Sequence, residues 1–322
     1  MREVIGVVRG GPSNEYEISL KSGASILESL NTEKYDARDI FIDRSGEWHM
    51  YGSPVSPEKA LQGVDVVFNA LHGEYGEDGK LQRMLDQLAV PYTGSGAMAS
   101  SLAFHKQRTN EAVKKLGIKV PHSIFLEPEG DIEDIAFNTF RTFPHPAIVK
   151  PVVGGSSVGI TLATSFQSLQ EGLRHAASVS PKIMVEEFIK GREATVGVID
   201  GFRGEDTYAL MPVEIIPPPS QPFFNYEAKY SGESTERVPA HFSQEEKKVL
   251  MDAARKVHEG LELSHYSRSD FIVSPRGVYF LEVNTLPGLT KESLLPKALS
   301  AVGTKLSDFL DHIIALAKRK RE

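Results

Sequence analysis

The residues best suited to chemistry lie near the C-terminal end of the sequence. Arg268 and Asp270 stand two positions apart, as do Glu282 and Asn284, and alternate residues of a strand point to the same face. If the two segments pair as a hairpin, Asp270, Glu282 and Asn284 converge and offer hard oxygen ligands suited to Mg²⁺ on nucleotide phosphates. Arg268 would add positive charge for a transferring phosphoryl group. Taken alone, the segment also fits a solvent-facing polar edge without a metal.

A lysine followed by a loop of small residues is typical of phosphate binding. Lys150 ends an apolar run and precedes the Gly/Ser loop 154–159. Backbone N–H groups of such a loop can approach phosphate oxygens while the ammonium adds charge. The spacing fits neither a Walker P-loop nor a Rossmann fingerprint, and a plain surface turn is the alternative.

Acidic residues at the end of an apolar strand indicate a nucleoside contact. Glu186, Glu187 and Ile189 end the apolar run that begins near Lys182, and Glu193 follows. Backbone groups at such a strand end can meet an adenine, and a carboxylate can accept hydrogen bonds from ribose hydroxyls. An ordinary strand end has the same composition.

Three single residues each have a functional and a structural interpretation. Glu15 lies just inside a predicted helix, where a carboxylate can pair with a substrate ammonium or stabilise the helix dipole. His72 precedes a glycine turn at a strand end and is either a site residue or a buried structural histidine. Lys106 is either a phosphate ligand or an exposed helix residue.

A long segment without regular periodicity, about 217–240, is rich in Pro, Ser, Glu and Tyr. A connection of this length inside a compact protein is typical of a functional lid or a disordered segment. Lys229 and Tyr230 lie in it, and they fit a lid that closes over an anionic substrate.

The elements that must position these residues alternate between strand-like and helix-like patterns, which predicts an α/β or α+β fold with partly parallel sheets. The run 4–8 leads through a glycine turn into a helix predicted to begin near Asn14, with Asn14 and Glu17 spaced as a capping box. A second such unit runs from 64–68 into the turn 72–79. The apolar stripe of the first helix is predicted to be Leu20, Ala24, Leu27 and Leu30.

Further strands and a domain boundary follow from the same patterns. A boundary is expected near 101–104, after a stretch rich in Gly, Ser and Ala. A helix is expected near the C-terminus, built on Leu306, Phe309, Leu310, Ile313 and Leu316. The predicted strands are 147–150, 182–188, 194–199, and 271–274 paired with 278–283 through a turn at 275–277.

Composition limits the class of protein. The 322 residues are enough for two or three packed domains, and the apolar fraction of 40% and charged fraction of 25% are ordinary for a globular protein. A net charge of −7 argues against a nucleic-acid binder. No apolar run approaches the roughly 18 residues that span a bilayer, and the early strand leaves no room for a signal peptide. With no cysteine in the chain, we expect a cytoplasmic protein without disulfides or thiolate metal sites.

The order and spacing of these motifs resemble the D-alanine–D-alanine ligases of the ATP-grasp superfamily. The resemblance runs from residue 4 to about 299. The matching stretches are 10–15 with 18–20, 72–73 with 76–79, 150–151, 155–159, 226–230, 268–270, 282–290 and 293–296.

The resemblance implies an ATP-grasp fold with an N-terminal Rossmann-like α/β domain. The implied division is an N-terminal substrate-binding domain at 1–104, a central subdomain at 105–185, and a C-terminal subdomain at 186–322 that carries the lid. ATP would lie between the last two. It also implies a ligase that joins two D-alanines for peptidoglycan precursor synthesis, has ATP and D-alanine as small-molecule partners, and forms a homodimer. No nucleic-acid or membrane partner is expected.

The resemblance assigns the nucleotide site residue by residue. Two Mg²⁺ ions, for which Mn²⁺ can substitute, would be carried by Asp270, Glu282 and Asn284. The phosphates would be held by Lys106, Lys150, Lys229 and the loop containing Ser157. The adenine would meet Glu186, Glu187 and Ile189, and the ribose Glu193.

The amino-acid sites are assigned in the same way. Glu15 would take the ammonium of the first D-alanine and link through Ser156 to Tyr230, and His72 matches the amino-acid pockets. Arg268 and the N–H of Gly288 would stabilise the tetrahedral oxyanion. The carboxylate of the second D-alanine would be received by Ser293 and Leu294.

The chain departs from the usual family pattern at Gly154, Phe224 and His105, and none of these removes a group that the chemistry needs. The alternatives are a relative that uses D-lactate or D-serine as second substrate, and an ATP-binding module without catalysis. The intact segment 226–230 favours D-alanine, and the retained Arg268 and Asp270 favour an enzyme.

Overall fold

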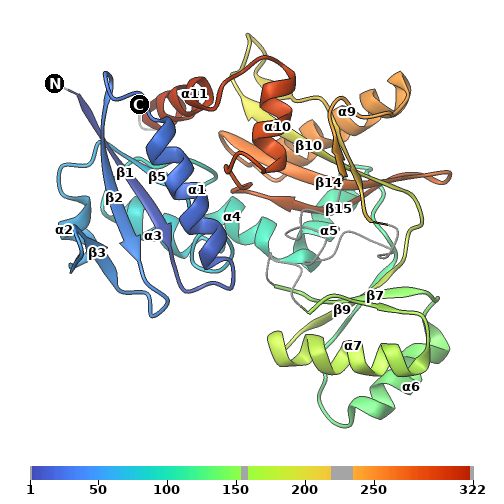
Figure 1. Cartoon of the computed structure of the whole chain (residues 1–322). Helices are drawn as coiled ribbons and strands as arrows, with labels where there is room; N and C mark the ends of the chain where they lie inside the picture. Colours follow the sequence, from blue (N-terminus) through green and yellow to red (C-terminus); the bar gives the residue numbers. More distant parts are fainter. Residues whose placement is uncertain (1, 154–158, 219–234, 320–322) are drawn as a thin grey trace.

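The computed structural model describes residues 2–153, 159–218 and 235–319, and the strands in these ranges form three sheets (Figure 1). None of the helices in the described ranges combines the length and apolar character that a bilayer crossing requires.

The N-terminal sheet has the strand order β4-β3-β2-β1-β5. Its strands are β1 (Glu3–Gly10), β2 (Tyr35–Ile42), β3 (Trp48–Met50), β4 (Ser53–Pro54) and β5 (Val66–Asn69). β2, β1 and β5 run parallel, and β3 and β4 add antiparallel strands at one edge. The strands predicted at 4–8 and 64–68 are therefore confirmed as β1 and β5.

Helices cover both faces of this sheet, which explains the continuous apolar run of β1. Val7 packs in one hydrophobic cluster with α1 (Tyr16–Ser29) and α11 (Leu306–Arg319). Val8 packs in another with α2 (Pro57–Leu61) and α3 (Lys80–Gln87). The predicted C-terminal helix is confirmed as α11.

The start and the buried face of α1 differ from the prediction. Helical residues begin at Tyr16 with Glu15 at the N-cap position, and the expected capping box of Asn14 and Glu17 is wrong because no side chain caps this helix. Ser13 holds the preceding turn instead, since its Oγ accepts a hydrogen bond from Glu15 N at 3.1 Å. The buried residues of α1 are Ser19, Ser22, Gly23 and Ile26. Part of the predicted stripe is confirmed, since Leu30 at the C-cap is buried and Leu27 packs against the same core, whereas Leu20 and Ala24 are only half-buried.

The central sheet is antiparallel throughout, with the order β6-β9-β7-β8. Its strands are β6 (Ser123–Leu126), β7 (Ala147–Pro151), β8 (Thr161–Ala163) and β9 (Ile183–Glu187), and it carries α6 (Ile132–Thr142) and α7 (Phe166–Val179) on the face away from the C-terminal sheet (Figure 1). The predicted strands at 147–150 and 182–188 are confirmed as β7 and β9. Because β9 continues to Glu187, Glu186 and Glu187 belong to this sheet, whereas the expected division at 185/186 places them in the next unit.

The C-terminal sheet is also antiparallel and has the order β13-β12-β10-β14-β15, with β11 paired to β10. Its strands are β10 (Arg192–Asp200), β11 (Thr207–Ala209), β12 (Val213–Ile216), β13 (Thr235–Arg237), β14 (Tyr266–Ser274) and β15 (Gly277–Asn284). The predicted strand 194–199 and the hairpin turning at Pro275 and Arg276 are confirmed.

Three helices pack with the C-terminal sheet in one hydrophobic cluster: α4 (Ala97–Phe104), α5 (Lys106–Lys115) and α9 (Gln244–Gly260). Val113 of α5 is buried in this cluster with Leu250 of α9 and Phe271 of β14. The break between α4 and α5 falls at His105, where the boundary was expected, but α5 itself packs with the C-terminal sheet.

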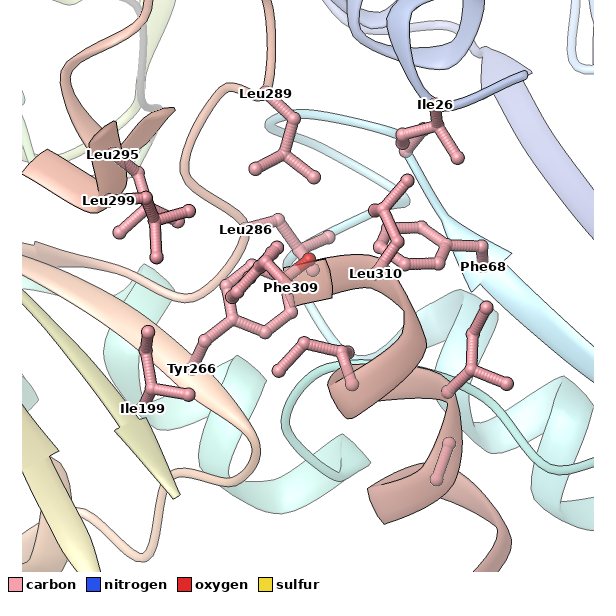
Figure 2. Packing of buried hydrophobic residues seen from close by; sticks show 14 of the residues in the cluster. Ile26, Phe68, Ile199, Tyr266, Leu286, Leu289, Leu295, Leu299, Phe309 and Leu310 are labelled. Carbon is pink, nitrogen blue, oxygen red and sulfur yellow. The ribbon is translucent and has the colours of Figure 1, made fainter. Parts of the chain in front are cut away.

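One further cluster joins the N-terminal and C-terminal sheets. Phe309 and Leu310 of α11 lie between Phe68 of β5 and Tyr266 of β14 (Figure 2). Leu295 and other residues of α10 (Leu294–Ala301) complete it. This shared core fixes the loop after β15 against the ends of β5 and α1, where several of the predicted site residues lie.

Candidate active site

A large cavity of about 520 Å³ lies where the central sheet meets the C-terminal sheet. Ligand pockets in proteins are typically about 300 to 1,000 Å³, so a nucleotide-sized molecule fits. Among its lining residues are seven of the predicted site residues: Lys150, Glu186, Glu187, Ile189, Glu193, Asp270 and Glu282. β7 and β9 contribute residues to one side of its lining, and β10, β14 and β15 contribute residues to the other.

A buried ion pair forms the wall from the central sheet. Lys150 Nζ donates to Glu186 Oε1 at 2.8 Å, and the two side chains are only 7% and 4% exposed. The second oxygen, Glu186 Oε2, has no hydrogen-bond partner among the described residues. Burial raises the pKa of Glu186, and the neighbouring Lys150 partly offsets this effect. Glu282 also raises this pKa and Lys106 lowers it, which places both charges close to the pair.

The other predicted nucleoside contacts lie where the chain passes from β9 into β10 of the C-terminal sheet. Glu187 Oε1 forms an ion pair with Arg276 Nη1 at 2.8 Å, which connects β9 to the hairpin turn between β14 and β15. Ile189 is buried, and Glu193 stands in β10 opposite Ile215 and Ile272. An apolar floor with carboxylates at its edge suits a nucleoside.

The hairpin of β14 and β15 brings the predicted cation ligands together. Asp270 lies opposite Glu282, and Arg268 lies opposite Asn284. Arg268 holds the Asp270 carboxylate with two bonds, from Nε at 3.0 Å and from Nη2 at 2.9 Å. Thr195 Oγ1 donates to Asp270 at 2.6 Å, which fixes the same carboxylate from β10. A β-bulge between Asp270 and Phe271 marks this place in the ladder.

The donor set fits a hard divalent cation. Asp270, Glu282 and Asn284 offer carboxylate and amide oxygens, the ligands that Mg²⁺ prefers. Asn284 Nδ2 lies 3.5 Å from Asp270 Oδ2, so the two side chains share one face of the hairpin. Lys106 lies beside them, because it lines a small cavity of about 30 Å³ together with Glu282 and Asn284.

His72 lies at a buried junction between the N-terminal and C-terminal units. Its Nδ1 is 2.9 Å from the Leu286 carbonyl oxygen, and its Nε2 is 2.9 Å from Ser22 Oγ. A carbonyl only accepts, so Nδ1 donates to it and Nε2 accepts from the serine hydroxyl. Ser22 Oγ in turn accepts from Leu289 N at 3.4 Å. Burial lowers the pKa of His72 to about 4, so the ring is neutral at neutral pH.

Glu77 is a second residue of this junction, and sequence reasoning did not single it out. Its Oε1 accepts from Thr285 Oγ1 and from Leu286 N, both at 3.1 Å, and its Oε2 accepts from Gly73 N at 2.8 Å. Burial raises the pKa of Glu77. Its position between two glycines of the turn 72–79 could have drawn attention to it, but a glycine-rich turn is usually exposed to solvent. We call Ser22, His72, Glu77 and the loop 285–289 the interdomain junction.

Glu15 lies beside this junction. Its Oε2 is 2.9 Å from the position that a Cβ at residue 73 would occupy, so the glycine at 73, with φ of +71°, lets the carboxylate lie directly over the turn. Glu15 is at the N-terminus of α1, where its charge also complements the helix dipole.

The loop 285–289 leads to the residues expected to hold a second carboxylate. Ser293 is the N-cap residue of α10, and Leu294 is its first helical residue. Ser293 Oγ lies 2.7 Å from Thr290 Oγ1 and accepts from Thr290 N at 3.2 Å. A Cβ at Gly288 would lie 2.8 Å from Ser293 Oγ, so the backbone passes close to this helix start. A helix N-terminus of this kind favours an anion.

Four predicted site residues, Ser156, Ser157, Lys229 and Tyr230, lie outside the described residues, as do Gly154 and Phe224. The predicted site residues that the structure describes lie at the large cavity, at the small cavity beside it, at or beside the interdomain junction, and at the start of α10. Arg268 joins the large cavity and the interdomain junction, because it faces Asp270 at the cavity and its charge contributes to lowering the pKa of His72.

Comparison with known protein families identifies both ends of the chain. The model described as D-ala D-ala ligase N-terminus matches residues 4–56 and 51–95, and the model described as D-ala D-ala ligase C-terminus matches residues 112–315. Together they span the interdomain junction, the large cavity and α10.

Individual relatives agree. The chain is 38% identical over 319 residues to a D-alanine–D-alanine ligase from Geotalea uraniireducens (strain Rf4), covering 98% of this chain and 96% of that protein. It is 38% identical over 313 residues to one from Aquifex aeolicus (strain VF5), covering 96% and 98%.

Solved structures share the whole fold. The VanG D-Ala:D-Ser ligase from Enterococcus faecalis has a TM-score of 0.84 and 32% identity, covering 98% of this chain and 100% of that chain. The D-alanine–D-alanine ligase from Bacillus anthracis complexed with ATP has a TM-score of 0.81 and 29% identity, covering 99% and 98%. The predicted ATP-grasp fold is therefore confirmed.

Proposed function

The chain belongs to the D-alanine–D-alanine ligase family, and on that basis we propose that it joins two D-alanines into D-alanyl-D-alanine at the expense of ATP, for peptidoglycan precursors. The observation that carries this function is that charged residues from two different sheets converge at the large cavity. Lys150 and Glu186 come from one sheet, and Arg268, Asp270 and Glu282 come from another.

We propose that ATP occupies the large cavity. The adenine would lie against Ile189 near Glu186 and Glu187, with the ribose at Glu193. Lys150 and Lys106 would hold the phosphates at the end of the cavity nearest the β14–β15 hairpin. The resemblance adds Ser157 and Lys229 to this phosphate site.

The family is ATP-dependent and generally requires a metal, and we propose Mg²⁺ or Mn²⁺ at Asp270, Glu282 and Asn284. Bound there, the cations supply charge neutralisation to the nucleotide phosphates. Arg268 holds Asp270 in place from two nitrogen atoms, so its guanidinium would be held in advance beside the reacting phosphoryl group. A donor held in advance needs no reorganisation when negative charge develops.

The two amino acids would meet at the interdomain junction. Glu15 would pair with the ammonium of the first D-alanine, and Ser156 and Tyr230 would extend this contact. The carboxylate of the second would lie at Ser293 and Leu294, at the N-terminus of α10. His72 is neutral and bonded at both nitrogens, so its role here is to hold the loop 285–289 in place rather than to transfer a proton.

The reaction follows from the need to activate a carboxylate. A carboxylate oxygen of the first D-alanine attacks the γ-phosphorus, ADP leaves, and an acyl phosphate forms. The amine of the second D-alanine attacks the acyl carbon and loses a proton, and phosphate leaves with the original carboxylate oxygen. Arg268 and the N–H of Gly288 would donate to the tetrahedral oxyanion.

We further propose three units, with residues 188–191 as the connection between the central and C-terminal parts, because β9 ends at Glu187 and β10 begins at Arg192. A homodimer in the cytoplasm, where ATP is supplied, is proposed from the family alone. Light scattering tests the dimer directly.

The second substrate is the point on which close relatives differ. The D-Ala:D-Ser ligase named above has the same fold, so fold alone does not separate a D-serine from a D-alanine acceptor. The more similar curated relatives are D-alanine–D-alanine ligases, which favours D-alanine.

The test is phosphate release from ATP and Mg²⁺ with D-alanine, run beside L-alanine and beside D-alanine with D-serine or D-lactate. Release with D-alanine alone, and the dipeptide among the products, supports the proposal. Release that requires the second acid assigns the chain to a mixed-product relative. ATP binding without release in any mixture contradicts the ligase proposal.

A further inference from the structure

The helix that carries the expected acceptor residues is anchored by an ion pair one turn from its start. Lys297 lies on α10 after Ser293 and Leu294, and its backbone N donates to the Ser293 carbonyl at 3.2 Å. Any shift of α10 at Lys297 therefore moves the helix N-terminus, which has to meet the second carboxylate.

Lys297 forms its closest contact with a shielded carboxylate. Its Nζ lies 2.7 Å from Glu236 Oε2 and 3.3 Å from Glu292 Oε2. The Glu236 side chain is 15% exposed and that of Lys297 is 33% exposed, whereas Glu292 is 88% exposed. A pair with one shielded partner is screened less than a surface pair, so Glu236 is the partner that holds Lys297.

Glu236 lies on the strand next to a wall of the large cavity. It lies in β13, directly opposite Ile215 of β12, and Ile215 lines the cavity. The neighbouring charges on these strands are already paired with each other, since Arg237 Nη1 lies 3.6 Å from Glu214 Oε2. The contact of Lys297 with Glu236 thus connects the acceptor helix to β13, the strand that pairs with Ile215 in the wall of the proposed ATP site.

We propose that Lys297 and Glu236 are positioning residues for the second amino acid. Their ion pair sets the place of α10 relative to β12 and β13, and so the place of Ser293 and Leu294 relative to the acyl group formed at the cavity. This inference rests on the proposed function, because it concerns the acceptor of that reaction. Neither residue touches the reacting atoms.

The expected effect is confined to the acceptor. Groups in direct contact are energetically coupled, and a fivefold change in an equilibrium constant corresponds to about 1 kcal/mol. We expect Lys297→Met to raise the KM for the second D-alanine about fivefold. The turnover number, the KM for the first D-alanine and the KM for ATP should stay within about twofold of the parent values.

The experiment compares five proteins in steady-state assays of dipeptide formation, with the two D-alanine constants resolved from the dependence of rate on concentration. They are the parent, Lys297→Met, Glu236→Gln, the charge-swapped double variant Lys297→Glu with Glu236→Lys, and Lys34→Met. Lys34, just before β2, pairs with Asp311 of α11 at 2.5 Å and, among the described residues, makes no ion pair with α10, so its removal matches the loss of a lysine ion pair. We expect both single variants at Lys297 and Glu236 to have a raised KM for the second D-alanine. The charge-swapped double variant should recover the KM of the parent, and Lys34→Met should resemble the parent.

Three results would overturn the inference while leaving the proposed function intact. These are a parent-like acceptor constant in Lys297→Met, a charge-swapped variant no better than the single ones, or all constants and the melting temperature changing together, which indicates general destabilisation. If the parent itself forms no dipeptide from D-alanine, the proposed function fails and this inference falls with it.

Discussion

The interdomain junction and the large cavity are both lined by buried polar groups, but they satisfy them differently. At the junction both nitrogens of His72 and both carboxylate oxygens of Glu77 have hydrogen-bond partners within the protein. At the cavity, Glu186 keeps one oxygen without a partner among the described residues, and it stands beside space for a ligand. The hydrogen bonds of the junction hold the loop 285–289 in place before any substrate binds. At the cavity, the charged side chains pair with each other and remain able to bind a ligand.

The largest effect should come from breaking the buried pair at the cavity. Lys150→Met leaves the Glu186 carboxylate buried without its cation, which should cost about 3 to 5 kcal/mol of unfolding free energy. Chemical denaturation measures this loss, and calorimetric titration with ADP should show weaker binding. The double variant Lys150→Met with Glu186→Gln should recover most of the stability but not the nucleotide affinity. Recovery of both would contradict the assignment of Lys150 to the phosphates.

Removing the guanidinium that fixes Asp270 should affect rate rather than stability. Arg268→Met should lower kcat by about 10²- to 10³-fold, because a preorganised donor to developing charge is lost. The matched control is Arg255→Met, whose guanidinium pairs with Asp252 at 2.8 Å on α9. Steady-state phosphate release measures kcat for both variants. A decrease in kcat of less than about threefold in Arg268→Met would argue against a role of Arg268 in catalysis.

The junction should respond to pH, because the pKa of His72 in the folded protein, about 4, lies below its ordinary value of 6.5. The neutral ring stabilises the fold, so this contribution is present above about pH 6.5 and is lost as the pH falls towards 4. Between pH 7 and pH 5 the contribution of His72 to the free energy of unfolding should decrease by about 2 kcal/mol. Denaturation at both values should show this decrease in the parent, and His72→Asn should lack it. An equal decrease in both proteins would place its origin elsewhere.

The smallest change is expected at the hydroxyl that bridges His72 and the loop 285–289. Ser22→Ala removes the donor to His72 Nε2 and the acceptor for Leu289 N, and should cost about 1 to 2 kcal/mol of unfolding free energy. Ser178→Ala serves as control, since that exposed hydroxyl donates only to the His175 carbonyl. Equal stability of the two variants would mean that the bridging hydroxyl is not part of what fixes the loop.

The same contrast explains how much of the molecule the sequence predicts. The hairpin that aligns Asp270 with Glu282 was predictable, because strand periodicity places alternate residues on one face whatever the rest of the chain does. The β1 and β5 strands were predictable for a related reason, since only a strand buried on both faces is apolar throughout.

The junction was harder to predict because its residues act through contacts distant in sequence. Glu77 contacts Thr285 and Leu286, more than 200 positions away, so nothing local distinguishes it from a solvent-exposed turn residue. Part of the buried face of α1 was missed for the same reason. Ser22 and Gly23 look like surface residues, yet Ser22 is buried as a hydrogen-bonding partner and Gly23 packs against Arg9.

In the proposed reaction, a D-alanine carboxylate is activated at the large cavity by transfer of the γ-phosphoryl group. D-alanine labelled with ¹⁸O in its carboxylate tests it most directly, with the released phosphate analysed by mass spectrometry. We expect one labelled oxygen in each phosphate released, because the acyl phosphate breaks between the acyl carbon and that oxygen. Unlabelled phosphate released alongside the dipeptide would contradict it, since the carboxylate oxygen would then never have been joined to phosphorus.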